Sequence, residues 1–293
     1  MTNKKNIIRF TIYDKLKFFI FLAFYKVIAP FESKNHRFRI MFNEIAFLFH
    51  IFTKFRSMKS VGKRVIKLKT SLGDFYIRDI EIDWLMASPA FERQDLNMLI
   101  RTIKSFLDSY PDKEVLFLDI GASIGKYTIA IGKQLKRYNH RLKILAFEPD
   151  PEGFKLLKKN VQLNSLNNVR VYKKALSDSK IQSDFFYYEP MQMIVSFKTA
   201  EKIKVTTDTL DNILKKEAIA DNIFVVLDVE GHEVNVLKGM KETVNKSSYT
   251  YLLIEDAVKQ TKKTLERYLS NNFIFNNKVS QNNSFWFKQN GKN

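Results

Sequence analysis

The sequence predicts an α/β fold built on a mostly parallel sheet, and three observations lead to this prediction. Short, continuously apolar runs such as 115–120 and 224–229 alternate with longer segments whose apolar residues recur at helical spacing. Continuously apolar strands are buried on both faces, which is typical of a parallel sheet covered by helices on both sides. The last apolar runs, 273–275 and 285–287, flank an Asn- and Ser-rich turn and predict an antiparallel hairpin.

Before the alternating part, two short strands at 65–68 and 74–78 and a helix within 91–107 are expected. Strands and helices then follow in this order: strand 115–120, helix 125–137, strand 144–147, helix 151–163, strand 169–172, short strands 185–188, 194–197 and 203–207, strand 224–229, helix 233–244, strand 251–254 and helix 259–269. The chain therefore divides into a basic helical extension (1–69), a connecting part (70–110) and an α/β domain (111–293).

Composition limits the classes of protein to consider. A chain of 293 residues with 45% hydrophobic and 27% charged residues is that of a folded globular protein. The absence of cysteine excludes disulfides, thiolate metal sites and a thiol nucleophile, and it fits a cytoplasmic protein. The formal net charge of +18 is placed unevenly, because residues 1–69 alone carry 16 Lys or Arg against three acids. The same segment holds 12 of the 26 phenylalanines.

This basic, aromatic-rich segment points to a polyanionic surface as partner. Its apolar runs, 18–25 and 45–52, are too short to span a bilayer, and no small-x-small cleavage site follows them. Phe18, Phe21, Leu22 and Tyr25 recur at helical spacing between lysines, which favours a helix lying on the inner face of an anionic membrane. Packing against the rest of the chain and contact with nucleic acid are the alternatives.

The first motif with chemical content is a glycine-containing turn between strand 115–120 and the next helix. It runs from Asp119 through Gly121 and Ser123 to Gly125. Glycine allows close approach of the backbone to a ligand, and a helix N-terminus offers unpaired N–H groups to an anion. A tight turn that needs small residues for packing alone would look the same.

An acid at the end of the second strand strengthens the functional interpretation. Glu148 follows Gly125 by 23 residues, where Rossmann-like sites place the acceptor for the hydroxyls of a nucleoside ribose. A dinucleotide site would have a glycine at Ser123, whereas Asp119 suits an amino-acid ammonium group. An ammonium and a ribose on one ligand indicate S-adenosylmethionine.

Six ordered sequence blocks resemble the FkbM-type methyltransferase family over roughly residues 112–258. They are Asp-x-Gly-Ala-x-x-Gly-x-x-Thr (119–128), Ala-Phe-Glu-Pro-Asp-Pro (146–151), Leu-Asn (163–164), Ala-Leu-Ser-Asp (175–178), Thr-Leu-Asp (209–211) and Leu-Asp-Val-Glu-Gly-His-Glu-x-x-x-Leu-Lys-Gly (227–239). The resemblance implies a Rossmann-like class I methyltransferase sheet of seven strands, the last antiparallel. It also implies O-methylation of sugars or natural products. Ser123 and Val226 depart from the asparagine and lysine common at these positions.

Carried over residue by residue, the resemblance implies a cofactor site and a reaction site. The turn should hold the methionine end, Glu148 the ribose, and the segment after strand 169–172 the adenine. Asp228 and Glu230 should lie where the transferable methyl group points. The cofactor-binding residues implied in this way are Asp119, Gly121, Ala122, Ser123, Gly125, Thr128, Glu148, Pro149, Leu176, Ser177, Asp178 and Asp228.

Methyl transfer to a hydroxyl group needs alignment and a base. Of the four histidines only His232 lies inside a motif, which makes it, with Asp228 and Glu230, a catalytic candidate. A histidine at a helix start without catalytic duty is the alternative. Glu255 and Asp256 are weaker candidates at the end of the next strand. Asp228, Glu230, His232 and Glu233 could cluster around a metal ion, but residues 230 and 232 are too closely spaced to converge on it, so no metal is expected.

The sequence thus predicts a cytoplasmic, S-adenosylmethionine-dependent O-methyltransferase of a sugar, a glycan or a lipid-linked glycan. One rival is an RNA or protein methyltransferase that grips a polyanion through residues 1–60, although no Gly- or Arg-rich RNA module is present there. The other rival is an inactive scaffold that keeps the fold; the intact acids at 119, 148 and 228 argue against it.

Overall fold

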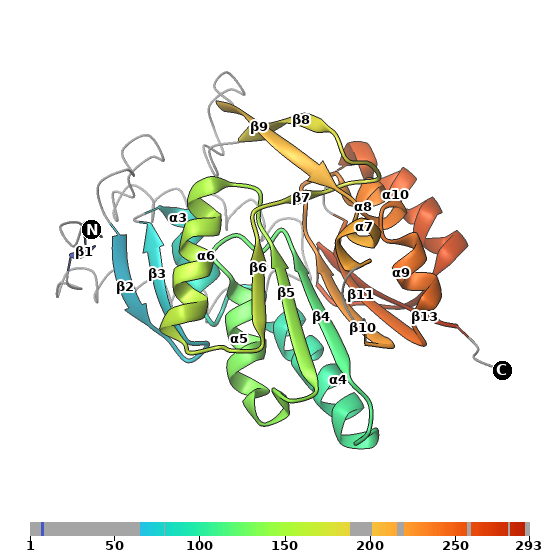
Figure 1. Ribbon diagram of the computed structural model, residues 1–293, viewed down its shortest axis with the longest axis horizontal. Coiled ribbons are helices and arrows are strands. Elements are labelled where there is room, and N and C mark those ends of the chain that lie inside the picture. The colour runs from blue at the N-terminus through green and yellow to red at the C-terminus, as the bar shows by residue number, and fades with distance from the viewer. Residues whose placement is uncertain are drawn as a thin grey trace, which may run out of the picture. The chain divides into compact units, whose positions relative to one another are not determined.

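In the computed structural model, strands and helices alternate along most of the chain (Figure 1). The structure describes residues 7–8, 65–78, 80–187, 201–215, 220–256, 259–280 and 282–290. The aromatic stripe expected at 18–25, the run 45–52 and the strand expected at 194–197 lie outside these ranges. The chain divides into two units, one of residues 1–93 with 186–202 and one of residues 94–185 with 203–293. The division expected at residues 69 and 110 stays a prediction.

The described residues of the first unit form a small three-stranded sheet and helix α3 (Glu81–Ala87). Strand β1 (Ile7–Ile8) pairs in parallel with β2 (Val65–Lys69), which pairs antiparallel with β3 (Asp74–Arg78) before helix α3. A buried ion pair connects β3 to α3, because Arg78 donates through its side chain to both carboxylate oxygens of Asp83. Both strands that the sequence predicts here are confirmed.

The second unit is built on a seven-stranded sheet in the order β12-β13-β11-β10-β4-β5-β6. All neighbours are parallel except those of β13, which runs antiparallel to β11 and to β12. The strands are β4 (Val115–Ile120), β5 (Leu142–Phe147), β6 (Val169–Tyr172), β10 (Asn222–Leu227), β11 (Tyr249–Glu255), β12 (Ile274–Lys278) and β13 (Asn283–Gln289). The predicted fold class, mostly parallel with an antiparallel last strand, is confirmed.

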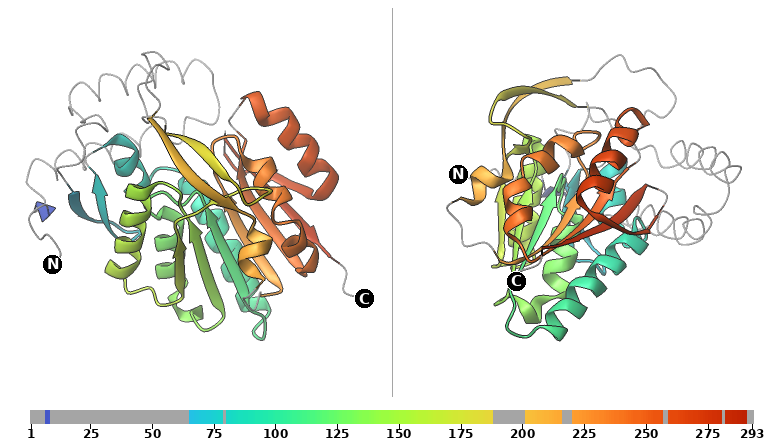
Figure 2. Two further views of the ribbon diagram at one scale, coloured as in Figure 1. Left: turned by 45° about the horizontal axis from the view of Figure 1, so that its top comes forward. Right: turned by 90° about the vertical axis from the view of Figure 1, so that its right-hand side faces the viewer.

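Helices cover both faces of this sheet (Figures 1 and 2). A core of buried residues such as Leu118, Val225, Leu237 and Leu265 joins one face to α7–α10. The other face carries α4, whose Phe106 packs against Phe224, together with α5 and α6. The helices are α4 (Arg93–Ser109), α5 (Lys126–Gln134), the 3-10 helix η4 (Lys136–Tyr138), α6 (Pro151–Leu163), α7 (Leu210–Leu214), α8 (Glu233–Lys238), α9 (Lys241–Lys246) and α10 (Lys259–Asn272).

A small sheet of strands β7 (Ala175–Leu176), β9 (Glu201–Asp208) and β8 (Gln182–Tyr187), in that order, follows β6. Strands β8 and β9 confirm the strands expected at 185–188 and 203–207, with somewhat different limits, whereas β7 was not expected.

The helix expected at 233–244 is wrong in one respect, because the structure breaks it into α8 and α9. Gly239 sits at the break, where a Cβ atom would come within 1.9 Å of the carbonyl oxygen of Ser177. The new helix start is capped from elsewhere, since the Asp211 carboxylate accepts the backbone N–H groups of Glu242 and Thr243. Contacts distant in sequence therefore end one helix and begin the next.

Among the described residues, no helix is both long and apolar enough to cross a membrane.

Candidate active site

The turn between β4 and α5 is held tightly in place at the C-terminal edge of the sheet. Gly121, Ser123 and Gly125 all have left-handed φ angles, of 87°, 49° and 96°. The backbone N–H groups of Gly121 and Ala122 both donate to the carbonyl oxygen of Phe147, at 3.0 Å each. The turn is thus pinned to the end of the neighbouring strand β5.

Gly121 also fixes the distance between this turn and the end of β10. A Cβ atom at Gly121 would lie 1.8 Å from the carbonyl oxygen of Asp228, far inside any allowed contact. The backbone N–H of Asp228 donates to Ile120 at 3.1 Å, so the two strand ends are bonded as well as packed. Only glycine permits this approach. Gly125 has a different neighbour, because its Cβ would lie 2.6 Å from a methyl group of Leu157 on α6.

Asp119 anchors the start of α5. Its Oδ2 accepts the backbone N–H of Thr128 at 2.9 Å and the Thr128 hydroxyl at 2.5 Å. Both residues are almost fully buried, and a carboxylate at a helix N-terminus is favoured by the helix dipole. The structure gives Asp119 and Thr128 a mutual contact, while contact of either with a methionine group stays a prediction.

Glu148 lies directly after β5 and faces the same turn. One carboxylate oxygen accepts the N–H of Ser123 and the other that of Asp150, both at 2.7 Å. The side chain is therefore fixed with both oxygens at the strand end, beside Pro149. Contact of this carboxylate with the hydroxyls of a ribose stays a prediction.

A chain of hydrogen bonds joins the segment after β7 to the start of α8. The side-chain nitrogen of Asn235 is a donor and cannot accept a hydrogen bond. It lies 3.3 Å from Nδ1 of His232, which must therefore be the acceptor. The His232 proton then resides on Nε2, which lies 3.0 Å from the Ser177 hydroxyl. Ser177 in turn donates to Asp178 at 3.2 Å. Both ring nitrogens of His232 are therefore engaged.

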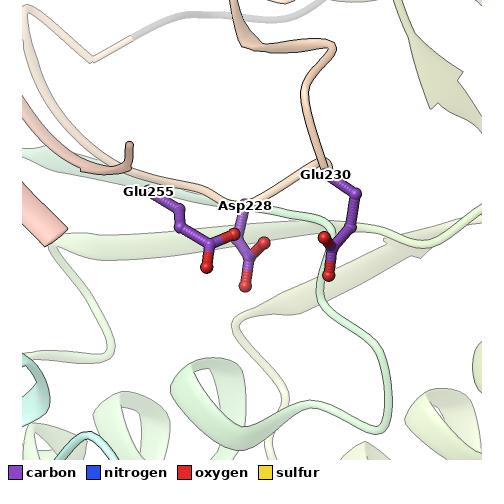
Figure 3. Close-up of side chains that lie close together, drawn as sticks. All are labelled: Asp228, Glu230 and Glu255. Atoms are coloured by element: carbon purple, nitrogen blue, oxygen red, sulfur yellow. The ribbon is translucent and has the colours of Figure 1, made fainter. Parts of the chain in front are cut away.

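Three carboxylates gather where β10 and β11 end (Figure 3). Asp228 lies between Glu255 and Glu230, and one oxygen from each lies within 4.8 Å of the others. Glu230 has a left-handed φ of 54°, an unfavourable conformation for a residue with a Cβ. Such a spacing would also let the three share one divalent cation, which prefers oxygen ligands. Acidic groups also gather without a cation, and the absence of a metal stays a prediction.

The surroundings of Glu230 change its affinity for a proton. Partial desolvation raises the pKa of Glu230 above its ordinary value, and the nearby charge of Glu233 raises it further. Glu233 is itself buried and accepts the N–H of Gly231 at 2.9 Å. Glu230 is therefore more ready to accept a proton near neutral pH than an ordinary glutamate.

The structure brings most of the sequence-predicted residues to one edge of the sheet. Leu176 and Ser177 are both buried, and Asp178 is exposed. Of the two weaker candidates, Glu255 joins Asp228, whereas Asp256 binds Lys278. Sequence reasoning missed the contact of Asn235 with His232. The spacing of three residues at the start of a helix could have indicated it, because side chains three positions apart are neighbours on a helix.

Comparison with known proteins gives consistent results. The profile of the methyltransferase FkbM domain matches residues 119–275, more than half of the chain. A hexuronic acid methyltransferase, AglP, from Haloferax volcanii is 24% identical over 185 residues, or 62% of this chain and 69% of that protein.

Two further matches are more partial. A tRNA (guanine(26)-N(2))-dimethyltransferase from Methanococcus maripaludis is 31% identical over 90 residues, or 31% of this chain, so the match spans only 24% of that relative's length. A crystal structure of an FkbM methyltransferase from Methylobacillus flagellatus aligns with a TM-score of 0.41 at 14% identity, covering 72% of this chain and 63% of that one.

Proposed function

The chain belongs to the FkbM family of methyltransferases, and from that premise we propose that it methylates a hydroxyl group of a sugar, a glycan or a lipid-linked glycan. S-adenosylmethionine is its methyl donor, which supplies an electrophilic methyl group at a sulfonium centre.

The residues at the strand ends fit this cofactor. Two backbone hydrogen bonds hold the Glu148 carboxylate at the end of β5, where Rossmann-like sites bind the two hydroxyls of a nucleoside ribose. The turn from Gly121 to Gly125 would hold the methionine end, and Ser177 with its neighbours would lie beside the adenine. His232 is bonded to Ser177, which suggests that it positions the adenine segment.

The three-carboxylate cluster is the observation that carries the choice of a hydroxyl acceptor. Carboxylates accept hydrogen bonds from hydroxyl groups and can take the proton that a hydroxyl loses on methylation. Because its pKa is raised, Glu230 is our first candidate for the base. Although the sequence favours His232, neither ring nitrogen of His232 is available without breaking a contact. The relative named as a hexuronic acid methyltransferase supports a sugar acceptor.

The acceptor is tested by comparing glycans and lipids from cells with and without the gene by untargeted mass spectrometry. We expect at least one glycan-containing species to lose the mass of one CH₂ unit when the gene is absent, and purified protein with S-adenosylmethionine to restore it. A mass change confined to tRNA or protein would contradict the proposal.

The cofactor site is tested by titrating S-adenosylmethionine into the Glu148→Ala variant in a calorimeter. Loss of hydrogen bonds to a charged acceptor should weaken binding by about 1.5–3 kcal/mol. Glu152→Ala, on the exposed side of α6, is the matched control and should bind as the wild type does. Equal affinity of Glu148→Ala and wild type would remove the ribose assignment.

RNA is the second candidate acceptor. The partial match to a tRNA dimethyltransferase and the excess of basic residues in 1–69 favour it. The same basic segment underlies our proposal of contact with the inner membrane face. Incubation with tRNA and labelled S-adenosylmethionine separates the candidates, and we expect no label in the tRNA.

A further inference from the structure

We propose that a pocket between α10 and the β12–β13 hairpin binds a second, neutral sugar residue of the acceptor, so that the substrate is an oligosaccharide. This inference rests on the proposed function and extends it. The pocket has a volume of about 240 Å³ and lies between two elements of the second unit. That volume is below the roughly 300–1,000 Å³ of sites for drug-sized ligands, so it suits one small ring.

The pocket offers an aromatic wall. Phe275 on β12 is 51% exposed, and its ring meets that of Trp286 on β13 edge to face, with centroids 5.0 Å apart. Leu265 and Leu269 of α10 complete the apolar part of the lining. A half-exposed aromatic ring is a suitable surface for the apolar C–H face of a sugar ring, because contact removes both surfaces from water.

Charged groups around this wall leave hydrogen-bonding positions open. The Lys278 ammonium donates to both oxygens of the buried Asp256 carboxylate, which leaves its third N–H available. Lys262 lies 3.6 Å from the same carboxylate and is 44% exposed. Glu266 adds an exposed carboxylate that has no hydrogen-bond or ion-pair partner among the described residues.

The net charge of the lining indicates which sugar it takes. Two lysines face two acids, so the four charges balance and favour neither an anion nor a cation. What remains is a set of donors and acceptors beside an aromatic ring. This combination matches a neutral sugar, which has hydroxyl groups at its rim and an apolar face.

The position of the pocket connects it to the reaction site. Asp256 directly follows Glu255, at the end of β11. Glu255, the last residue of β11, joins the carboxylate cluster, while Asp256 lines the pocket. Strand β12 lies two strand spacings from β11, or about 10 Å. A glycan that crosses the end of β11 would reach both places, whereas a single sugar ring would not.

The test compares Phe275→Ala with Ile274→Ala in the full-length protein. Ile274 is equally exposed, at 56%, but it is the preceding residue of β12 and does not line the pocket, so it is a matched control. The probes are maltotriose, cellotriose, triacetylchitotriose and mannotriose, with their monosaccharides and glucuronic acid as comparison. Binding is measured by saturation-transfer NMR in the presence of S-adenosylhomocysteine.

We expect at least one trisaccharide to bind the wild type more tightly than its monosaccharide does. Phe275→Ala should weaken that binding about tenfold, Ile274→Ala should leave it unchanged, and Phe275→Tyr should restore it because the ring is kept. Absence of binding by all four trisaccharides, equal binding by Phe275→Ala, or preference for glucuronic acid would overturn the inference.

A methylation assay keeps this inference distinct from the proposed function. If the wild type methylates a glycan and Phe275→Ala has the same KM for it, the pocket assignment is wrong and the function stands. If no sugar is methylated but trisaccharide binding depends on Phe275, the proposed function is wrong and the assignment of the pocket as a sugar-binding site stands.

Discussion

Replacing Glu230 with glutamine is expected to lower the turnover of methyl transfer about 10²–10⁴-fold, the usual contribution of a general base. Glutamine has nearly the same size and can still bond to a hydroxyl, but it cannot take a proton. The affinity for S-adenosylmethionine should stay within about twofold of the wild type, as measured by calorimetry. Glu242→Gln on α9, an exposed acid paired with Lys246, is the control and should keep full turnover.

The pH profile adds a second measurement of the same group. Only the ionised carboxylate can act as the base, so turnover should fall as the pH is lowered through the pKa of Glu230. Because that pKa is raised, the fall should begin at a higher pH than for an ordinary glutamate, and it should be absent from the residual activity of Glu230→Gln.

Two other outcomes would contradict this assignment. Full turnover in Glu230→Gln, together with a large loss in His232→Ala, would make His232 the base, as the sequence alone favours. Loss of wild-type turnover after dialysis against EDTA would instead assign the carboxylates of Asp228, Glu230 and Glu255 to a cation.

The second large effect is expected for Gly121→Ala. The left-handed backbone at this position costs a residue with a Cβ about 1–3 kcal/mol. The added atom would also lie 1.8 Å from the Asp228 carbonyl, so the β4–α5 turn and the end of β10 must separate. Together, the backbone strain and the clash should lower the melting temperature by roughly 6 °C or more, since each kcal/mol of lost stability lowers it by about 2–4 °C. S-adenosylmethionine affinity should fall at least tenfold, because the turn is displaced from Glu148.

Gly132→Ala serves as the matched control, since this glycine has an ordinary helical backbone and its Cβ would meet only the end of the Leu166 side chain. Differential scanning calorimetry of the two variants, with and without S-adenosylmethionine, measures both effects. A melting temperature of Gly121→Ala equal to that of Gly132→Ala, with cofactor binding intact, would show that the close approach to Asp228 is not required.

The sheet is the part of the fold that local sequence determines most completely. The runs 115–120 and 169–172 are found as strands with the predicted limits, and helix 151–163 also agrees. These segments have apolar patterns that match one type of secondary structure throughout, and Asp150 caps the helix by accepting the N–H of Gly153. A strand buried on both faces has no alternative arrangement that hides so many apolar side chains. The antiparallel terminal hairpin follows from its turn composition in the same way.

The order of strands and helices along the chain also predicts at which edge of the sheet the site residues lie, but it does not predict which of them are in contact. Glu148 and Asp228 end strands of a parallel sheet, so the sequence puts them at the same edge. The pairing of Glu255 with Asp228, of Ser177 with His232, and of Lys278 with Asp256 cannot be deduced in this way. Each joins residues more than 20 positions apart, and which of several acids or lysines meet depends on strand order and on the face to which each side chain points.

The sequence by itself therefore determined the type and order of most elements, the glycine-containing turn after β4 and the acids at the ends of the central strands. Only the tertiary structure decided that the 233–244 helix breaks at Gly239, that His232 is engaged at both ring nitrogens, and that Glu255 rather than Asp256 joins Asp228 and Glu230. The physical reason is the distance along the chain over which each kind of interaction acts. Apolar periodicity and caps act within one or two turns of chain, whereas a helix break, a hydrogen-bonded imidazole and a raised carboxyl pKa depend on atoms that only folding brings within a few ångströms.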